Sequence, residues 1–203
     1  MADAGRVIAG SARGTRLAAP GSGTRPLGDR VKQTLFAILE PDLPGARVLD
    51  LFAGSGAAGI EALSRGAAAA VFVERDPRAV AAIRENLARA GFGRPAALIV
   101  PADVLAFIGR PLEEHPPFDI VIADPPYAEP EALDPILRRL GAPIGPLVDG
   151  ARVVVKHFWR TQLPDRVGLL ASERVRRFGE TALTFYRRRP AEPGPTEDRA
   201  EAR

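Results

Sequence analysis

From Pro44 onward, short apolar runs alternate with amphipathic stretches, and this alternation limits the possible fold more than any other feature of the chain. Strands that alternate with helices imply a parallel sheet whose two faces are both covered by helices. Two boundary residues support the assignment, because Pro77 stands at the first turn of one predicted helix and Gly91 follows its last turn. The predicted strands are residues 46–54, 67–76, 96–103, 118–126 and 151–157, and the predicted helices are residues 56–66, 77–91 and 131–141.

The carboxyl-terminal part of the chain follows a different pattern. Residues 172–189 contain two strand-like runs joined by a short turn at Gly179 and Glu180, which is typical of an antiparallel hairpin. We therefore expect an α/β fold with a mostly parallel seven-stranded sheet that ends in an antiparallel hairpin strand. A parallel sheet finished in this way is characteristic of the class I methyltransferase variant of the Rossmann architecture.

A small extension precedes this sheet. Residues 6–18 predict two short strands around a glycine-containing turn, and residues 29–40 show apolar side chains at helical spacing. Asp29 is a candidate helix cap, and Pro41 ends the helix. We predict an amino-terminal hairpin and helix over residues 1–43, a main domain over residues 44–189, and a disordered tail rich in proline and charge over residues 190–203.

The composition excludes several kinds of site. The chain has 203 residues, no cysteine and only two histidines, His115 and His157. These counts exclude disulfides and thiolate nucleophiles, and we expect no metal site. No apolar run is long enough for a transmembrane helix, and the amino terminus lacks the pattern of a signal peptide. We expect a cytoplasmic protein that binds no membrane.

The first predicted strand ends in Asp50, and a glycine-rich turn, residues 53–56, leads from it into a helix. Gly54, Gly56 and Gly59 match the G-x-G-x-x-G spacing of dinucleotide sites, so NAD has to be considered. A carboxylate at Asp50, however, would lie close to a pyrophosphate anion. It suits instead a cofactor that carries a positive charge and an amino-acid end, as S-adenosylmethionine (SAM) does.

Two further acids follow the next two predicted strands. Glu74 lies about 20 residues beyond the glycines, where it can accept hydrogen bonds from both ribose hydroxyls of either cofactor. Asp103 is placed to accept a hydrogen bond from the adenine amino group. For all three acids the ordinary interpretation is a solvated loop acid or a helix cap. The predicted SAM-contacting residues are Asp50, Phe52, Ala53, Gly54, Ser55, Gly56, Glu74, Arg75, Asp103 and Val104.

The fourth predicted strand is followed by Asp124, Pro125, Pro126 and Tyr127. These four residues are similar to the mark of the amino-methyltransferases, which is Asp or Asn, two prolines and an aromatic residue. An exocyclic amine is a poor nucleophile, and Asp124 with the Pro125 carbonyl could hold it so that its lone pair points at the methyl group. Tyr127 offers a face for stacking on a flipped base. We take these four residues as the catalytic set.

Motifs along most of the chain make the resemblance more specific. Residues 5 to about 187 resemble the RsmD family, through "TRPLGDRVKQTLFAIL", "VLDLFAGSGAAGIEALSRGA", "VFVERD", "DIVIADPPY" and "RRFGETALTFY" in that order. The resemblance implies SAM-dependent methylation of guanine N2 in 16S ribosomal RNA, on the small subunit or an assembly intermediate, by a monomer. Two positions depart from the family pattern. The position after Pro26, usually a Ser or Thr, is Leu27 here and is followed by Gly28. The strand after the Asp-Pro-Pro-Tyr motif, which usually ends in an acidic residue, ends in Lys156 and His157.

Basic residues are concentrated in two segments, 1–32 and 173–189, although the net charge of the chain is only +3. Such clusters suit RNA, and a solubilising surface is the alternative. By the resemblance, the amino-terminal hairpin and the segment 25–32 would contact RNA or close over the cofactor. The predicted RNA-contacting residues are Arg6, Arg13, Arg16, Arg25, Arg30 and Lys32.

Three rival functions remain at this point. Adenine-N6 methylation of DNA or RNA uses the same four-residue motif, although the chain has no room for a large target-recognition domain. An NAD-dependent dehydrogenase would leave the motif at Asp124 without a role. A non-catalytic RNA-binding module would not need the SAM-site residues.

Overall fold

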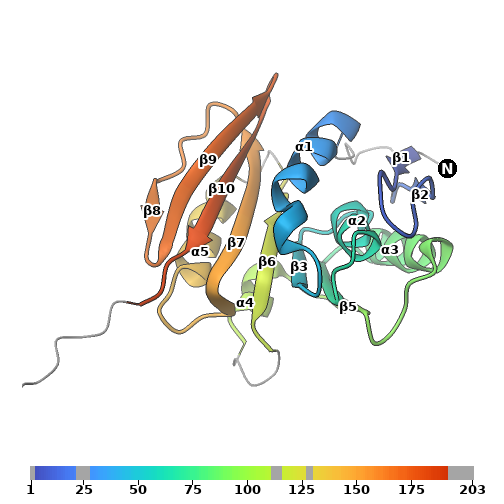
Figure 1. Cartoon of the computed structure of the whole chain (residues 1–203), viewed down its shortest axis with the longest axis horizontal. Coiled ribbons are helices and arrows are strands. Elements are labelled where there is room, and N and C mark those ends of the chain that lie inside the picture. Colours follow the sequence, from blue (N-terminus) through green and yellow to red (C-terminus); the bar gives the residue numbers. More distant parts are fainter. Residues whose placement is uncertain (1–2, 22–27, 111–115, 127–129, 192–203) are drawn as a thin grey trace, which may run out of the picture.

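The computed structural model describes residues 3–21, 28–110, 116–126 and 130–191, and a single large sheet runs through it (Figure 1). The strands of this sheet are β3 (Arg47–Leu51), β4 (Ala69–Glu74), β5 (Ala97–Pro101), β6 (Phe118–Ala123), β7 (Leu147–Phe158), β8 (Arg166–Val167), β9 (Leu170–Phe178) and β10 (Thr181–Arg188). Their order across the sheet is β5-β4-β3-β6-β7-β10-β9-β8.

The strand directions confirm the predicted fold class. The pairs β4–β5, β3–β4, β3–β6 and β6–β7 are parallel. Strand β10 is antiparallel to both β7 and β9, so the carboxyl-terminal hairpin closes the sheet as expected. The seven predicted strands are all present, and the two-residue strand β8 adds an eighth at the edge.

Helices cover both faces of the sheet because its central strands are apolar on both sides. Helices α1 (Asp29–Leu39), α2 (Ala57–Ser64) and α3 (Pro77–Ala90) pack on the face that carries Val48 and Phe72. Helices α4 (Val104–Ile108) and α5 (Leu133–Leu140) pack on the face that carries Leu49 and Val71. The 3-10 turn η1 (Glu40–Asp42) follows α1, and the 3-10 turn η3 (Pro130–Ala132) precedes α5.

The helix boundaries follow the local chemistry, with one correction. Asp76 caps α3 by accepting the Arg78 N–H at 2.8 Å, Pro77 is its first residue, and Gly91 ends it in a left-handed conformation. Asp29 is not the cap of α1. It is the first residue of the helix, where an acidic side chain suits the helix dipole, and Gly28 takes the cap position without a side-chain bond.

The amino-terminal hairpin consists of β1 (Asp3–Arg6) and β2 (Arg16–Ala18), so its first strand lies earlier than predicted. Its connecting loop rests on the end of α2. At Gly10, where φ is +85°, a Cβ would lie 1.7 Å from the Ser64 carbonyl oxygen, so only glycine permits this approach. The hairpin, α1 and the sheet share one apolar core cluster. Among the described residues, no helix is long and apolar enough to cross a membrane.

Candidate active site

A cavity of about 710 Å³ opens at the carboxyl-terminal ends of β3, β4 and β6. In doubly wound sheets this edge is where ligands bind. Of the predicted SAM-contacting and catalytic residues that the structure describes, all line the cavity except Gly56, the residue before α2. They are Asp50, Phe52, Ala53, Gly54, Ser55, Glu74, Arg75, Asp103, Val104, Asp124, Pro125 and Pro126.

The loop between β3 and α2 is shaped by unusual backbone angles. Phe52 has a φ of 59°, which is rare for a bulky residue and marks local strain of the kind found at binding sites. Gly56, with a φ of 76°, is the residue before α2. The Gly54 N–H donates to Glu74 Oε2 at 2.8 Å, so the loop is fastened to the end of the next strand.

Close packing behind the loop also depends on a glycine. A Cβ at Gly59 would lie 2.3 Å from the Phe72 ring, so a side chain here would push α2 away from β4. The third glycine of the G-x-G-x-x-G spacing therefore serves helix–strand contact in this chain. The Gly59 N–H meanwhile donates to Asp50 Oδ2 at 2.8 Å.

Asp50 is a buried acid at the centre of the site. Burial is the main cause that raises its pKa to about 8, and the negative charges of Asp124 and Glu74 act in the same direction. The hydrogen bond from Gly59 opposes this rise. A carboxyl group in this state is well placed to ionise when a cation enters the cavity beside it.

Glu74 and Asp103 face the cavity but already accept backbone hydrogen bonds. Glu74 Oε1 accepts the Asp76 N–H at 2.9 Å, in addition to the bond from Gly54 to its other oxygen. Asp103 Oδ1 accepts the Ala106 N–H at 3.1 Å and caps α4. Each carboxylate keeps further lone pairs for a ligand, since two oxygens offer about four acceptor positions.

The second half of the site follows β6. Asp124 Oδ1 lies 2.6 Å from Lys156 Nζ, which comes from the neighbouring strand β7. Burial is the largest influence and leaves the pKa of Asp124 raised, while the charge and hydrogen bond of Lys156 act to lower it. Pro125 is buried and Pro126 is exposed at the cavity wall. Tyr127 lies outside the described residues, so its stacking role stays a prediction.

The predicted RNA-contacting residues have different environments. Arg6, Arg13, Arg16 and Arg30 are exposed, and Arg6 forms a loose ion pair with Asp29 at 4.0 Å. Arg25 lies outside the described residues. Their RNA contacts remain a prediction.

Lys32 needs a correction, because it is buried within the protein and does not present its ammonium group to a surface ligand. Its Nζ donates to the Arg6 carbonyl and lies 3.7 Å from Glu61 Oε2.

Sequence reasoning missed two residues that organise the site. Asn86 Nδ2 donates to the carbonyls of Ala18 and Ser55, both at 2.9 Å, so α3 joins the amino-terminal hairpin to the loop between β3 and α2. The sequence signal for Asn86 was its position as a polar residue among the apolar, buried positions of α3. Lys156 was noted in the sequence as a departure from the family pattern, but its pairing with Asp124 was not expected.

His157, by contrast, has a structural role. Its Nε2 lies 2.8 Å from Thr184 Oγ1 and its Nδ1 lies 2.9 Å from the Phe158 carbonyl oxygen. Burial lowers its pKa, so the ring is neutral near pH 7. With both ring nitrogens engaged, it is a poor general base.

The site as a whole offers carboxylates for a cation, backbone donors and acceptors for an amino acid or ribose, and an amine acceptor beyond them. Within residues 3–21, 28–110, 116–126 and 130–191, no group of His, Cys, Asp or Glu could hold a metal ion. The arrangement suits group transfer between two organic ligands that lie side by side.

Comparisons with known proteins find relatives that match most of this chain. The family model described as "Conserved hypothetical protein 95" matches residues 5–187. Ribosomal RNA small subunit methyltransferase D of Escherichia coli K12 is 36% identical over 184 residues, which cover 90% of this chain and 89% of that protein. A solved hypothetical protein of Thermus thermophilus is 35% identical, with a TM-score of 0.75 over 89% of this chain and 97% of that one.

A more distant structure shares the fold. An RNA methyltransferase from Salinibacter ruber, solved in complex with S-adenosyl-L-homocysteine, has a TM-score of 0.60 at 20% identity. The alignment covers 84% of this chain and 97% of that one.

Proposed function

This chain belongs to the family of conserved hypothetical protein 95, the RsmD family, and we propose that it methylates the exocyclic N2 of a guanine in 16S ribosomal RNA. It is a SAM-dependent methyltransferase. The observation that carries the proposal is the position of Asp124. This amine acceptor lines the same cavity as Asp50 and the 52–56 loop, so a target amine and a methyl donor would lie side by side.

The residues present fit SAM. Asp50 would pair with the ammonium of its amino-acid end, Glu74 with the ribose hydroxyls and Asp103 with the adenine amine, while the 52–56 backbone would border the sulfonium centre. When bound, SAM supplies an activated methyl group. The buried acid at Asp50 favours a cationic ligand over the pyrophosphate of NAD, because pyrophosphate would place two negative charges together.

Asp124 and the Pro125 carbonyl would accept the two N–H bonds of the target amine. These contacts position the nitrogen and turn its lone pair toward the methyl carbon, so catalysis rests on orientation and electrostatics. The carbon–nitrogen bond forms as the carbon–sulfur bond breaks with its electron pair going to sulfur, and the released proton passes to water. Transfer is direct, since the chain has no cysteine for a covalent intermediate.

The RNA substrate would be held beyond the cavity by Arg6, Arg13, Arg16, Arg25 and Arg30, with Tyr127 stacking on the flipped guanine. We propose that the substrate is the small subunit or an assembly intermediate, and that the protein acts as a monomer in the cytoplasm. The relative from E. coli is named for the small ribosomal subunit, which supports this assignment.

The decisive experiment is mass mapping of small-subunit rRNA from a strain that lacks this protein. We expect one N2-methylguanine to be missing and to return on complementation with the wild-type chain. Asp124→Ala should not restore it, because losing an oriented acceptor typically slows such steps by about 100-fold or more. Asp134→Ala is the matched control, since Asp134 is an exposed acid on α5.

Two outcomes would contradict the proposal. One is a missing N6-methyladenine, which would show the adenine rival to be correct. The other is full restoration by Asp124→Ala. Calorimetry with SAM and NAD separately tests the dehydrogenase, and a protein that binds RNA but not SAM would be a non-catalytic module.

A further inference from the structure

The pairing of Lys156 with Asp124 places a cation inside the base-binding half of the cavity. Their side chains are only 12% and 25% exposed, and the Nζ–Oδ1 distance is 2.6 Å. The pairing follows from the sheet, because Ala123 on β6 lies beside Val155 on β7 and the next residue of each strand points into the same cavity.

Lys156 is a positive charge among three acidic side chains of the cavity, Asp50, Glu74 and Asp124. Asp50 on β3 and Glu74 on β4 lie at the same strand edge, and each of them, like Asp124, carries negative charge when ionised. The loss of water favours the neutral form of Asp124, and it also favours the neutral form of Asp50, where repulsion by Asp124 and Glu74 adds to it. Lys156 opposes this effect at Asp124 through a direct, charge-assisted hydrogen bond.

The protonation state of Asp124 decides which base edge it can match. Guanine presents N1–H and N2–H side by side, two donors that an ionised carboxylate can accept together. Adenine presents an N6–H donor beside the N1 acceptor. That pattern matches a neutral carboxylic acid or an amide, each of which offers one acceptor and one donor. Enzymes that flip a base read it through this edge.

We propose that Lys156 is a specificity-determining residue, which selects guanine over adenine by holding Asp124 as a carboxylate. The inference rests on the proposed function and adds to it the reason for the base choice. Removing the ammonium group leaves the acid beside Asp50 and Glu74 without its counter-charge. Asp124 then becomes neutral at higher pH values than in the wild type, and the site accepts adenine better.

The test compares Lys156→Met, which keeps the length of the side chain without its charge, with Lys156→Arg, which keeps the charge. Small-subunit rRNA fragments would carry guanine or adenine at the mapped target position. Binding to the protein loaded with S-adenosyl-L-homocysteine, which cannot react, and methylation rates would both be measured from pH 6 to 9.

For Lys156→Met we expect the guanine-to-adenine ratio to fall at least tenfold at pH 6.5 and to recover as the pH rises and Asp124 ionises. Lys156→Arg should keep the wild-type ratio and pH profile. Asp124→Asn provides an independent check, since an amide should favour adenine at every pH. Folding and SAM affinity are followed by circular dichroism and calorimetry.

The inference is overturned if Lys156→Met folds, binds SAM and keeps the wild-type ratio and pH profile. Should Lys156→Met not fold, a wild-type preference for guanine in Asp124→Asn would overturn it instead. These results differ from a failure of the proposed function, in which the wild-type protein itself would methylate no guanine.

A second observation concerns the arginines of the carboxyl-terminal hairpin, which the structure divides into two groups. At its base, Arg187 Nε lies 3.1 Å from Glu173 Oε1, and Arg188 is buried and donates to loop carbonyls. In the outer half of β9, Arg174 and Arg176 are exposed. Neither has an acidic partner within the part of the chain that the structure describes.

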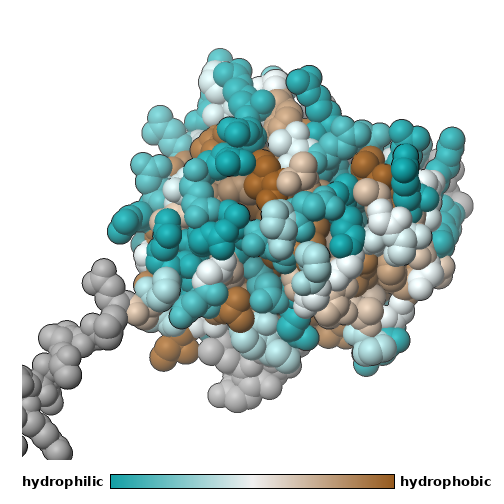
Figure 2. Space-filling view, viewed as in Figure 1, coloured by the Kyte–Doolittle hydropathy of each residue, from teal (hydrophilic) through white to brown (hydrophobic). Residues whose placement is uncertain are grey.

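These two arginines lie on the same strand, and Arg176 shares a face with Lys156. Arg176 pairs across the sheet with Leu183, which pairs with Lys156, so the three side chains lie on one face. Two strand spacings place the Arg176 backbone roughly 10 Å from that of Lys156. Figure 2 shows mainly hydrophilic residues over β8, β9 and β10 on this view of the molecule.

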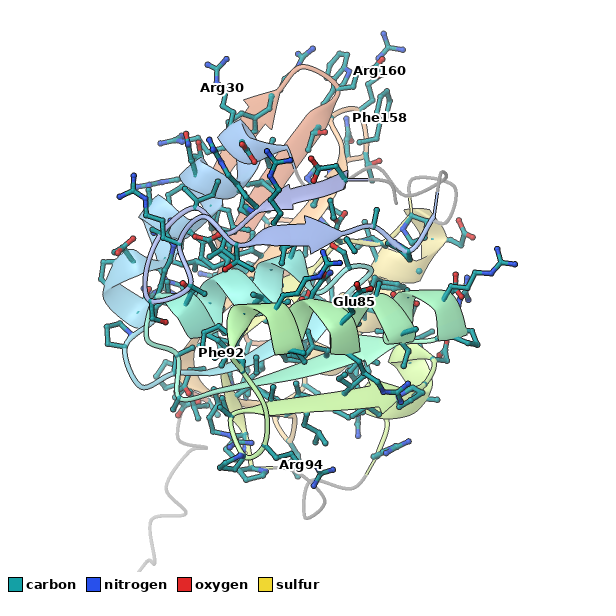
Figure 3. All side chains as sticks on the ribbon, turned by 90° about the vertical axis from the view of Figure 1, so that its right-hand side faces the viewer. Arg30, Glu85, Phe92, Arg94, Phe158 and Arg160 are labelled. Carbon is teal, nitrogen blue, oxygen red and sulfur yellow. The ribbon has the colours of Figure 1, made fainter. Side chains whose placement is uncertain are left out.

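An aromatic platform lies at the hairpin tip on the opposite face of β9, because Arg177 follows Arg176 in the strand and pairs with Ala182, which pairs with His157. The guanidinium carbon of Arg177 lies 3.6 Å from the centre of the Trp159 ring, and that of Arg160 lies 4.9 Å from it. Figure 3 shows Arg160, Phe158 and Arg30 at one end of the molecule and Arg94 at the opposite end. Proteins hold single-stranded RNA by combining positive charges along the backbone with aromatic side chains on which bases stack, and arginine adds cation–π contacts.

We infer that the outer half of β9 holds the single-stranded RNA that flanks the target base, with Arg174 and Arg176 on one face of the strand and Arg177, Arg160 and Trp159 at its tip on the other. The double variant Arg174→Ala/Arg176→Ala should bind oligouridine more weakly. The slope of log affinity against log salt should fall by about 1.4, since each phosphate contact on a single strand contributes about 0.7. Trp159→Ala should weaken binding without changing this slope.

Arg94→Ala is the matched control, and it should bind like the wild type. SAM affinity should stay unchanged in all variants. Unaltered RNA affinity and salt slope in the double variant would overturn the inference. A wild-type protein that binds no RNA would instead contradict the proposed function.

Discussion

Asp50 shows how one residue can link cofactor binding to pH. Its buried carboxyl group has a pKa of about 8 in the free protein, mainly because burial disfavours the charged form. The folded state therefore holds the proton more tightly than the unfolded chain between about pH 4 and 8. Stability from this group is complete below that window and is lost as the pH rises through it.

We predict that SAM binding at pH 7 releases a proton from Asp50, because the ligand's ammonium favours the carboxylate. Calorimetry in two buffers of different ionisation heat would measure this release. As the pH rises toward 8, the contribution of Asp50 to SAM affinity should increase by up to about tenfold per pH unit. Asp50→Asn should abolish the release, whereas Asp103→Asn should keep it. Equal heats in both buffers for the wild type would contradict the prediction.

The sequence allowed part of this site to be predicted at the level of residues. Asp50 and Asp124 could be placed at one strand edge, because each directly follows an apolar run and parallel strands end together. The Lys156 contact could not be foreseen, since it depends on the register between β6 and β7. The burial of Lys32 was missed for a similar reason, because its partner Glu61 lies on another helix.

At the scale of elements, a buried polar cluster fastens the amino-terminal hairpin to α2. The N–H groups of Ile8 and Ala9 donate to the two oxygens of Glu61 at 2.7 and 3.0 Å. Lys32 from α1 and Arg65, directly after α2, supply the positive charge. One side chain thus joins three segments, and both of its oxygens are in use.

We predict that Glu61→Ala lowers the free energy of unfolding by about 3–5 kcal/mol, because it strands a buried lysine and two backbone donors. Lys32→Met should cost less, since Arg65 still faces the carboxylate. Urea unfolding at pH 7 would measure both changes. Glu85→Ala is the control, because Glu85 forms an exposed ion pair with Arg89 and its loss should change the free energy of unfolding by less than about 1 kcal/mol. A loss of under about 1 kcal/mol in Glu61→Ala would refute this role.

Helices and strands could be predicted from the sequence where the apolar pattern extends over enough residues to show its period. Apolar patterns identified all five parallel strands and the helices α1, α2, α3 and α5. Helix α4 has five residues and β8 has two, too few to show a period, and both went unpredicted. The first hairpin strand was placed too late because Asp3–Arg6 contains little apolar sequence, and its burial comes from packing on α2.

For the whole molecule, the cavity joins two parts of the chain. Ala4, Ala19 and Pro20 from the amino-terminal segment line it together with the strand ends of the sheet. Asn86 holds the backbone of Ala18 and of Ser55 at the same time. A ligand in the cavity therefore contacts both parts, and its binding energy should stabilise their contact.

We predict that SAM at 100 times its dissociation constant stabilises the folded protein by about 2.7 kcal/mol, which for a chain of this size raises Tm by roughly 5–10 °C. Hydrogen exchange should slow in residues 3–20 as well as in the loop 52–56, because both border the ligand. Asn86→Ala should keep the protection of the loop but lose most of the protection of the hairpin, because the hydrogen bonds that join Ala18 and Ser55 through Asn86 are lost. If SAM protected only the loop in the wild-type protein, the hairpin would not be part of the binding unit.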